Sequence, residues 1–338
     1  MNQTLLGNEV RELYTAESSR IRQEFESCGD GRLVLRSRAA LIDRIVVMLW
    51  EKHFSSTPEH QRPTLVAIGG YGREALFPCS DLDILFLHES VQAENECKEP
   101  IRSFSQELWD IGIKVSPASR TLAECDRFDP TNAERFISLL DCRFVAGKQE
   151  MFGRMRDKVV PAVVARESQA IVQRLVELTR SRHAKYGNTV FHLEPNVKDG
   201  PGGVRDYNVA HWLALISALD KLHNWPNPDT LLPVSMRRHV ESAADFVFSV
   251  RCFLHWRHGR DDNNLSWAAQ DEAAARKIGS PEAQNLSAAD WMRLYFGHAR
   301  ALYRISTQLL DEVPAEWSSL YRQFQSWRSR ISNSEFSV

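Results

Sequence analysis

The stretch LVAIGGYGREALFPCSDLDILFL, residues 65–87, decides the fold, because it joins two apolar β-type runs through paired glycines and a Ser-Asp-x-Asp segment. In the second run Asp81 and Asp83 are separated by one apolar residue, so on a strand both carboxylates leave the same face. Two carboxylates this close repel each other unless a divalent cation lies between them. Mg²⁺ favours such oxygen ligands together with substrate phosphates, so the pair predicts metal-assisted phosphoryl chemistry.

Small and polar residues next to this pair are candidates for contacting phosphate. Gly69 and Gly70 follow the first apolar run and let the backbone approach an anion, and Ser80 offers a hydroxyl directly before the carboxylates. Arg73 lies three residues past Gly70 and either faces a phosphate or caps the end of a short helix. These residues predict a phosphate site beside the metal site.

The bulk composition indicates an ordinary globular protein. The 338 residues suffice for two domains, and 42 basic side chains nearly cancel 44 acidic ones, which gives no bias toward polyanions. The longest uninterrupted apolar run is far shorter than a bilayer span, and the six cysteines show no metal-binding spacing. We therefore expect a cytoplasmic protein with reduced thiols that binds neither nucleic acid nor membrane.

The periodicity of apolar residues changes along the chain and predicts an α+β fold. Residues 8–53 have helical spacing with a break at 28–32, short β-type runs begin at residue 64, and helical spacing dominates beyond about residue 120. We expect N-terminal helices over 1–60, a small mixed sheet with helices over 61–165, and a helical domain over 166–338.

A glycine-rich stretch, LEPNVKDGPGGVRDYN at 193–208, interrupts the helical part. Its breakers exclude a helix, and a helix is expected from Val204 onward. Two interpretations remain open from the residues alone. Either Lys198 and Arg205 reach a triphosphate across a cleft, or both are solvated and Asp206 serves as a capping residue.

The spacing of the glycines and the carboxylates resembles the signature of the DNA polymerase β-like nucleotidyltransferase superfamily. This resemblance implies a polymerase β-like nucleotidyltransferase domain followed by an α-helical domain, with two Mg²⁺ ions held by Asp81 and Asp83. It also implies a third carboxylate on a later, adjacent strand. Asp110 in WDIGIKV is the best candidate for that third catalytic carboxylate and metal ligand, the alternative being an N-cap or turn aspartate after a helix that ends at Trp109.

YGREALFPCSDLDILFL together with LEPNVKDGPGGVRD is similar to the bifunctional uridylyltransferase/uridylyl-removing enzymes that modify the bacterial nitrogen signal protein PII. The resemblance implies transfer of UMP from UTP to a PII tyrosine, with Gly69, Gly70, Ser80, Arg73, Lys198 and Arg205 around the triphosphate. The family continues into a phosphohydrolase domain and glutamine-sensing domains. This sequence has no His-Asp dipeptide, so we expect an N-terminal fragment without UMP removal or glutamine control.

Two alternatives remain beside this function. The first is nucleotide transfer of another kind, such as the adenylyl transfer to glutamine synthetase carried out by a related enzyme. The second is a catalytically silent module that binds nucleotide or docks PII.

Overall fold

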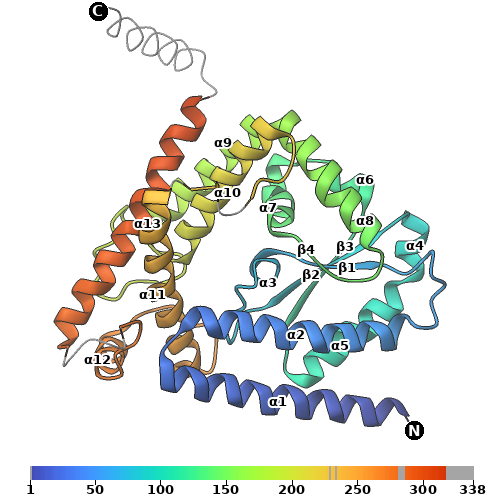
Figure 1. Ribbon diagram of the computed structural model, residues 1–338, viewed down its shortest axis with the longest axis horizontal. Coiled ribbons are helices and arrows are strands. Elements are labelled where there is room, and N and C mark those ends of the chain that lie inside the picture. The colour runs from blue at the N-terminus through green and yellow to red at the C-terminus, as the bar shows by residue number, and fades with distance from the viewer. Residues whose placement is uncertain (1, 228–229, 233, 281–285, 317–338) are drawn as a thin grey trace, which may run out of the picture.

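Two long helices form the N-terminal part of the computed structural model, which describes residues 2–227, 230–232, 234–280 and 286–316. Helices α1 (Asn2–Cys28) and α2 (Gly31–Phe54) pack side by side along the lower edge of Figure 1. The chain turns at Gly29, whose φ of 68° suits glycine, and the Asp30 side chain caps α2 by accepting from the Leu33 N–H at 3.0 Å. The expected helices and the break between them are confirmed.

A four-stranded mixed sheet lies against these helices. Its strands are β1 (Thr64–Ala67), β2 (Leu82–His88), β3 (Val115–Thr121) and β4 (Arg143–Ala146), in the spatial order β3-β2-β1-β4. β1 pairs antiparallel with β2 and with β4, whereas β2 and β3 are parallel. The expectation that residues 143–146 are helical is wrong, because β4 pairs along the edge of β1 and tertiary pairing overrides a weak local preference.

Both faces of the sheet are covered. Ile84 and Phe86 of β2 belong to a core cluster that also contains α2 and α5 (Lys98–Ile111) side chains. Leu85 and Leu87 point to the other face and join a second cluster with side chains of α9 (Val160–Lys185). Asp83 lies two residues before Leu85, so its carboxylate starts on the same face of the sheet, the face that α9 covers.

Short helices connect the strands, and long helices follow them. The short ones are α3 (Gly69–Gly72), α4 (Val91–Glu96), α6 (Leu122–Cys125), α7 (Ala133–Ile137) and α8 (Gln149–Arg154), with 3₁₀ turns at Pro130–Asn132 and Ser138–Asp141 and a π-helical turn at Met155–Val159. The long part contains α9, α10 (Val204–Leu222), α11 (Val234–His258), α12 (Trp267–Ala275) and α13 (Ala288–Glu316), with α13 along the left edge of Figure 1.

The expected boundary between residues 165 and 166 falls inside the continuous helix α9. The first core cluster also runs from the sheet and α2 into α10, α11 and α13. The sheet and the long helices therefore share packed interfaces on both sides, which fixes their relative position.

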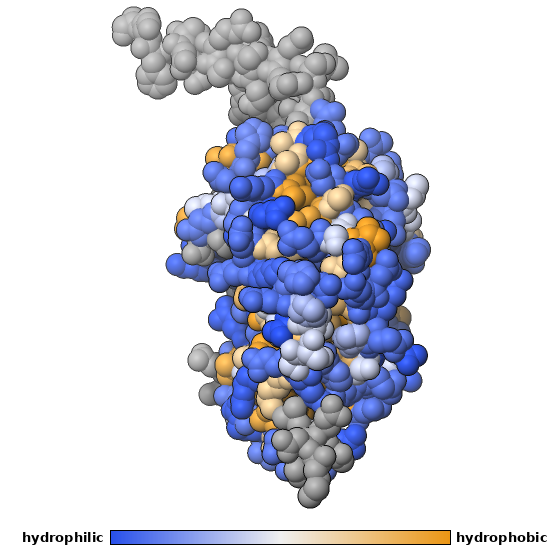
Figure 2. Space-filling model, turned by 90° about the vertical axis from the view of Figure 1, so that its right-hand side faces the viewer, coloured by the Kyte–Doolittle hydropathy of each residue, from blue (hydrophilic) through white to orange (hydrophobic). Residues whose placement is uncertain are grey.

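The face seen in Figure 2 is mostly hydrophilic, and its apolar side chains lie in separate small groups. Among the described residues, every helix falls short of the length and apolar character that a bilayer crossing requires.

Candidate functional site

The paired carboxylates lie at the start of β2 and face two adjoining cavities. Asp83 lines both the larger cavity, of about 810 Å³, and the smaller one, of about 210 Å³, while Asp81 lines the smaller. We call these the main cavity and the side cavity. Every residue predicted to contact phosphate lines one or both of them: Gly69, Gly70, Arg73, Ser80, Lys198 and Arg205. The structure therefore brings together the two motifs that are more than a hundred residues apart in the sequence.

The electrostatics of the pair suit a cation. Burial raises the pKa of the Asp83 carboxyl, and the charge of Asp81 raises it further, against the lowering effect of nearby cations such as Arg205. Within the described part of the chain, neither carboxylate accepts a hydrogen bond or forms an ion pair. Asp83 is half-buried and Asp81 is exposed. A pair of oxygen ligands without such partners fits Mg²⁺, which would offset their repulsion and complete its coordination with phosphate oxygens and water.

Gly69 is required for this arrangement. Its φ is 56°, in the left-handed region that glycine tolerates best, and a Cβ at this position would lie 2.9 Å from Oδ2 of Asp83. A larger residue would displace the carboxylate. The glycine thus allows α3 to begin directly beside the pair.

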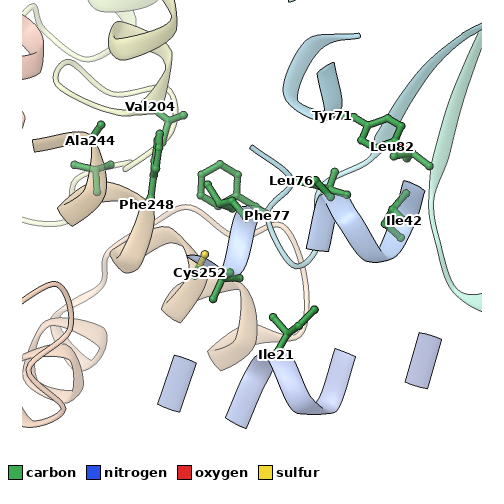
Figure 3. Packing of buried hydrophobic residues seen from close by; sticks show 14 of the residues in the cluster. Ile21, Ile42, Tyr71, Leu76, Phe77, Leu82, Val204, Ala244, Phe248 and Cys252 are labelled. Atoms are coloured by element: carbon green, nitrogen blue, oxygen red, sulfur yellow. The ribbon is translucent and has the colours of Figure 1, made fainter. Parts of the chain in front are cut away.

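The loop before Asp81 is anchored on α11. Figure 3 shows Phe77 between Leu76 on the sheet side and Phe248 and Cys252 on α11. The Phe77 and Phe248 rings meet edge to face at 5.6 Å, and the Arg251 guanidinium lies 4.0 Å from the Phe77 ring centroid. Two residues further on, the Cys79 backbone N–H donates to Nδ1 of His255 at 3.0 Å.

His255 extends this connection to the glycine-rich stretch at 193–208, which we call the glycine-rich loop. With Nδ1 accepting from Cys79, its other nitrogen Nε2 carries the proton and lies 2.9 Å from Asp261 Oδ1. Asp261 also accepts from Lys198 Nζ at 3.0 Å and from Arg251 at 3.1 Å. The hydrogen bond from His255, helped by these cations, holds the pKa of the Asp261 carboxyl well below its usual range. Asp261 itself lines the side cavity.

A buried carboxylate fixes the glycine-rich loop to α9. Asp206, in the first turn of α10, is fully buried and accepts from Arg182 Nη2 at 2.6 Å, from His183 Nε2 at 2.8 Å and from the Gly202 N–H at 2.7 Å. The expected helix from Val204 is confirmed. The interpretation of Asp206 as the capping residue is wrong, because the N-cap of α10 is Gly203 and makes no side-chain capping hydrogen bond. The Asp206 carboxylate instead joins the loop to two side chains of α9.

The two cations of the loop border the cavities while holding acidic partners. Lys198 pairs with Asp261 in the side cavity, and Arg205 Nε lies 3.5 Å from Asp199 with its side chain 44% exposed. Each of the two interpretations of this loop covers only part of what is observed, because both cations face the cavities and both also form ion pairs.

Arg73 forms part of the wall of the main cavity. Its guanidinium pairs with Asp141, which also accepts from Trp212 Nε1 at 2.9 Å, and it lies over the Trp212 ring. Burial raises the pKa of the Asp141 carboxyl to about 6, although Arg73 acts in the opposite direction. Arg73 is also the C-cap residue of α3, where its backbone N–H donates to the Gly69 and Tyr71 carbonyls, so the expected helix cap is confirmed while the guanidinium bonds to a carboxylate.

Asp110 is not brought to the pair, and the prediction that it lies on an adjacent strand is wrong. It lies in the last turn of α5, which Gly112 ends with a left-handed φ of 97°. Its side chain accepts from Gln106 at 2.8 Å, its backbone carbonyl accepts from Arg11, and it lines a separate cavity with them. The helix continues past Trp109, and the neighbouring strand starts only at Val115.

Several residues of the main cavity were missed by sequence reasoning. Arg120 lies on β3, and the others lie on helices or turns that pack over the sheet: Arg135, Asp141, Arg182, Lys185, Tyr186 and Trp212. Those on α9 lie in a segment where polar residues are ordinary features of an exposed helix face. Only the packing of α9 and α10 over the sheet brings them together.

Comparison with known proteins gives a consistent result. Residues 170–310 match the family described as GlnD PII-uridylyltransferase. Three curated proteins named bifunctional uridylyltransferase/uridylyl-removing enzyme are similar to most of the chain. The Nitrosococcus oceani protein is 30% identical over 297 residues, 86% of this chain and 32% of its own length. The Pasteurella multocida protein is 34% identical over 71% of this chain and 27% of its own length. The Azotobacter vinelandii protein is 34% identical over 74% of this chain and 27% of its own length. The chain thus spans about a third of the length of these relatives or less.

Proposed function

Because the chain belongs to the PII-uridylyltransferase family, we propose that it transfers UMP from UTP to a tyrosine hydroxyl of PII, with Mg²⁺ bound and pyrophosphate released. The observation that carries the proposal is the shared cavity wall. Asp81 and Asp83 open onto the same space as the cations Lys198 and Arg205. The relatives are named as uridylyltransferases, which favours UTP over other triphosphates.

The residues around the pair suit a triphosphate. Gly69 and Gly70 leave the backbone accessible, and Ser80 adds a hydroxyl in the side cavity. Lys198 and Arg205 hold carboxylate partners at 3.0 and 3.5 Å. Both side chains are part exposed, so a phosphate can replace or share those partners through charge-assisted hydrogen bonds.

The proposed reaction forms one bond and breaks one. The acceptor oxygen bonds to the α-phosphorus of UTP while the bond from that phosphorus to the α,β-bridging oxygen breaks, and the hydroxyl proton passes to solvent. Mg²⁺, when bound, supplies positive charge to the phosphate oxygens in this reaction. Arg205 and Lys198 stabilise the charge that develops on the departing pyrophosphate.

The test is incubation of the chain with PII, UTP and Mg²⁺, followed by intact mass measurement of PII. We expect a gain of one UMP per modified tyrosine with the native chain and none with an Asp81→Asn/Asp83→Asn variant of unchanged circular dichroism. Binding of UTP without any mass gain on PII would contradict the proposed transfer and support a silent module. A panel of α-labelled triphosphates distinguishes uridylyl from adenylyl transfer.

A further inference from the structure

A further metal ligand would have to come from β3, the strand beside the carboxylate pair. At the position next to the pair, the chain has a cation instead. β3 runs parallel to β2 with Asp83 opposite Ser116. The Leu82 N–H donates to the Lys114 carbonyl at 2.8 Å, which extends the pairing one residue back and sets Lys114 beside Asp81. Paired residues of parallel strands point to the same face, so the neighbours of the two carboxylates are a lysine and a serine.

The Lys114 side chain is exposed, and the residue lies directly before β3. A lysine ammonium has no lone pair for a metal and repels a nearby divalent cation. Ser116, which lines the main cavity with Asp83, offers a neutral oxygen only.

Two divalent ions in one site lie roughly 3.5 to 4 Å apart and need carboxylates enough to offset their mutual repulsion. Among the described residues, no group of three or more His, Cys, Asp or Glu side chains is placed to hold a metal. Asp110, the candidate for a third carboxylate, lines another cavity. One Mg²⁺, in contrast, commonly binds through one or two carboxylates together with substrate phosphates and water.

We infer that this site holds a single divalent cation, between Asp81 and Asp83, and that Lys114 occupies the place of a second one. This inference rests on the proposed function, because the nucleotide supplies the remaining ligands. The ion accompanies the triphosphate, and the acceptor hydroxyl has no second ion to lower its pKa. Introducing a carboxylate at position 114 therefore creates the missing ligand and removes the repelling charge in one substitution.

The experiment counts ions directly. Mn²⁺ is titrated into the chain saturated with α,β-methylene UTP, an analogue that cannot react at the α-phosphorus, and bound Mn²⁺ is measured by electron paramagnetic resonance. We expect one Mn²⁺ per chain for the native protein and two for Lys114→Asp. Lys114→Ala removes the charge without adding a ligand and is expected to stay at one. Transfer to PII is then expected to be at least tenfold faster in Lys114→Asp than in Lys114→Ala.

The outcomes separate this inference from the proposed function. Two Mn²⁺ per native chain, or a loss of one ion in Asp110→Asn, would overturn the single-ion assignment while leaving uridylyl transfer standing. Absence of any nucleotide-dependent Mn²⁺ in the native chain, with binding unchanged in Asp81→Asn/Asp83→Asn, would remove the metal site itself. Lys114 is exposed, so its substitutions are expected to fold, and circular dichroism checks this.

Discussion

Replacing Asp206 with alanine tests how the glycine-rich loop is held. The carboxylate is fully buried and accepts hydrogen bonds from Arg182, His183 and the Gly202 N–H. Its removal leaves a part-buried guanidinium and a buried imidazole without their acceptor. Removing one partner of a buried ion pair costs about 3 to 5 kcal/mol, and we expect the lower end, about 3 kcal/mol, because Arg182 retains some contact with water and with the Asp199 carbonyl.

A helix cap alone predicts a much smaller effect. Loss of a capping side chain costs about 1 kcal/mol, and loss of a favourable first-turn charge costs roughly 0.3 to 1 kcal/mol. The two explanations therefore differ by a factor of about three in the expected loss of stability, which urea unfolding monitored by circular dichroism resolves.

Asp199→Ala is the matched control. Asp199 lies in the same loop, but its side chain is 38% exposed and lies 3.5 Å from Arg205, so we expect a loss below about 1 kcal/mol. Equal unfolding midpoints and slopes for the two variants would refute the anchoring role of Asp206. A large loss for Asp206→Ala alone would show that the loop position depends on α9.

Three further outcomes are expected at the carboxylate pair and its cations. Asp81→Asn/Asp83→Asn keeps the native circular dichroism spectrum and abolishes Mg²⁺-dependent transfer of label from α-³²P-UTP to PII; persistent transfer would contradict the metal assignment. The pKa of Asp83 is raised by burial and by Asp81, so without metal the native chain is stabilised at low pH. Relative to Asp83→Asn, it loses stability as pH rises from the ordinary carboxyl range through the raised pKa. If the melting temperatures of the native chain and of Asp83→Asn change in parallel across that pH range, the shift in the pKa of Asp83 is absent. Arg205→Ala weakens UTP binding by about tenfold, or about 1.4 kcal/mol, with little change in melting temperature; an unchanged Kd with a large melting shift would indicate a structural role instead.

Local patterns in the sequence were sufficient for the centre of the site. The alternation around Asp81 and Asp83 and the adjacent glycines depend only on backbone geometry, which short segments encode. The helix from Val204 was equally clear because breakers precede it and apolar spacing follows. These features required no knowledge of what packs against them.

Asp110 shows where local patterns fail. The residues WDIGIKV are compatible with the end of a helix followed by a strand. The residue at which the helix ends decides whether Asp110 belongs to the helix or to the strand. Gly112 sets that position by ending α5 in a left-handed conformation. Because the helix ends a few residues later than predicted, the candidate ligand Asp110 lies in a different cavity from the carboxylate pair. The edge strand β4 was missed for a related reason, because its pairing with β1 lies some eighty residues away in sequence.

The carboxylate pair is only half of the site, and its position depends on the long helices. The loop before Asp81 is held by Phe77 packing on Phe248 and by the Cys79 N–H bonding to His255. His255 donates to Asp261, which also binds Lys198 from the glycine-rich loop. A substitution at any of these contacts shifts both the carboxylates and a phosphate-facing cation, because the buried imidazole of His255 positions both. The glycines and aspartates of residues 65–87 therefore provide the ligands, whereas the geometry in which they meet a triphosphate is set by α11, far away in sequence.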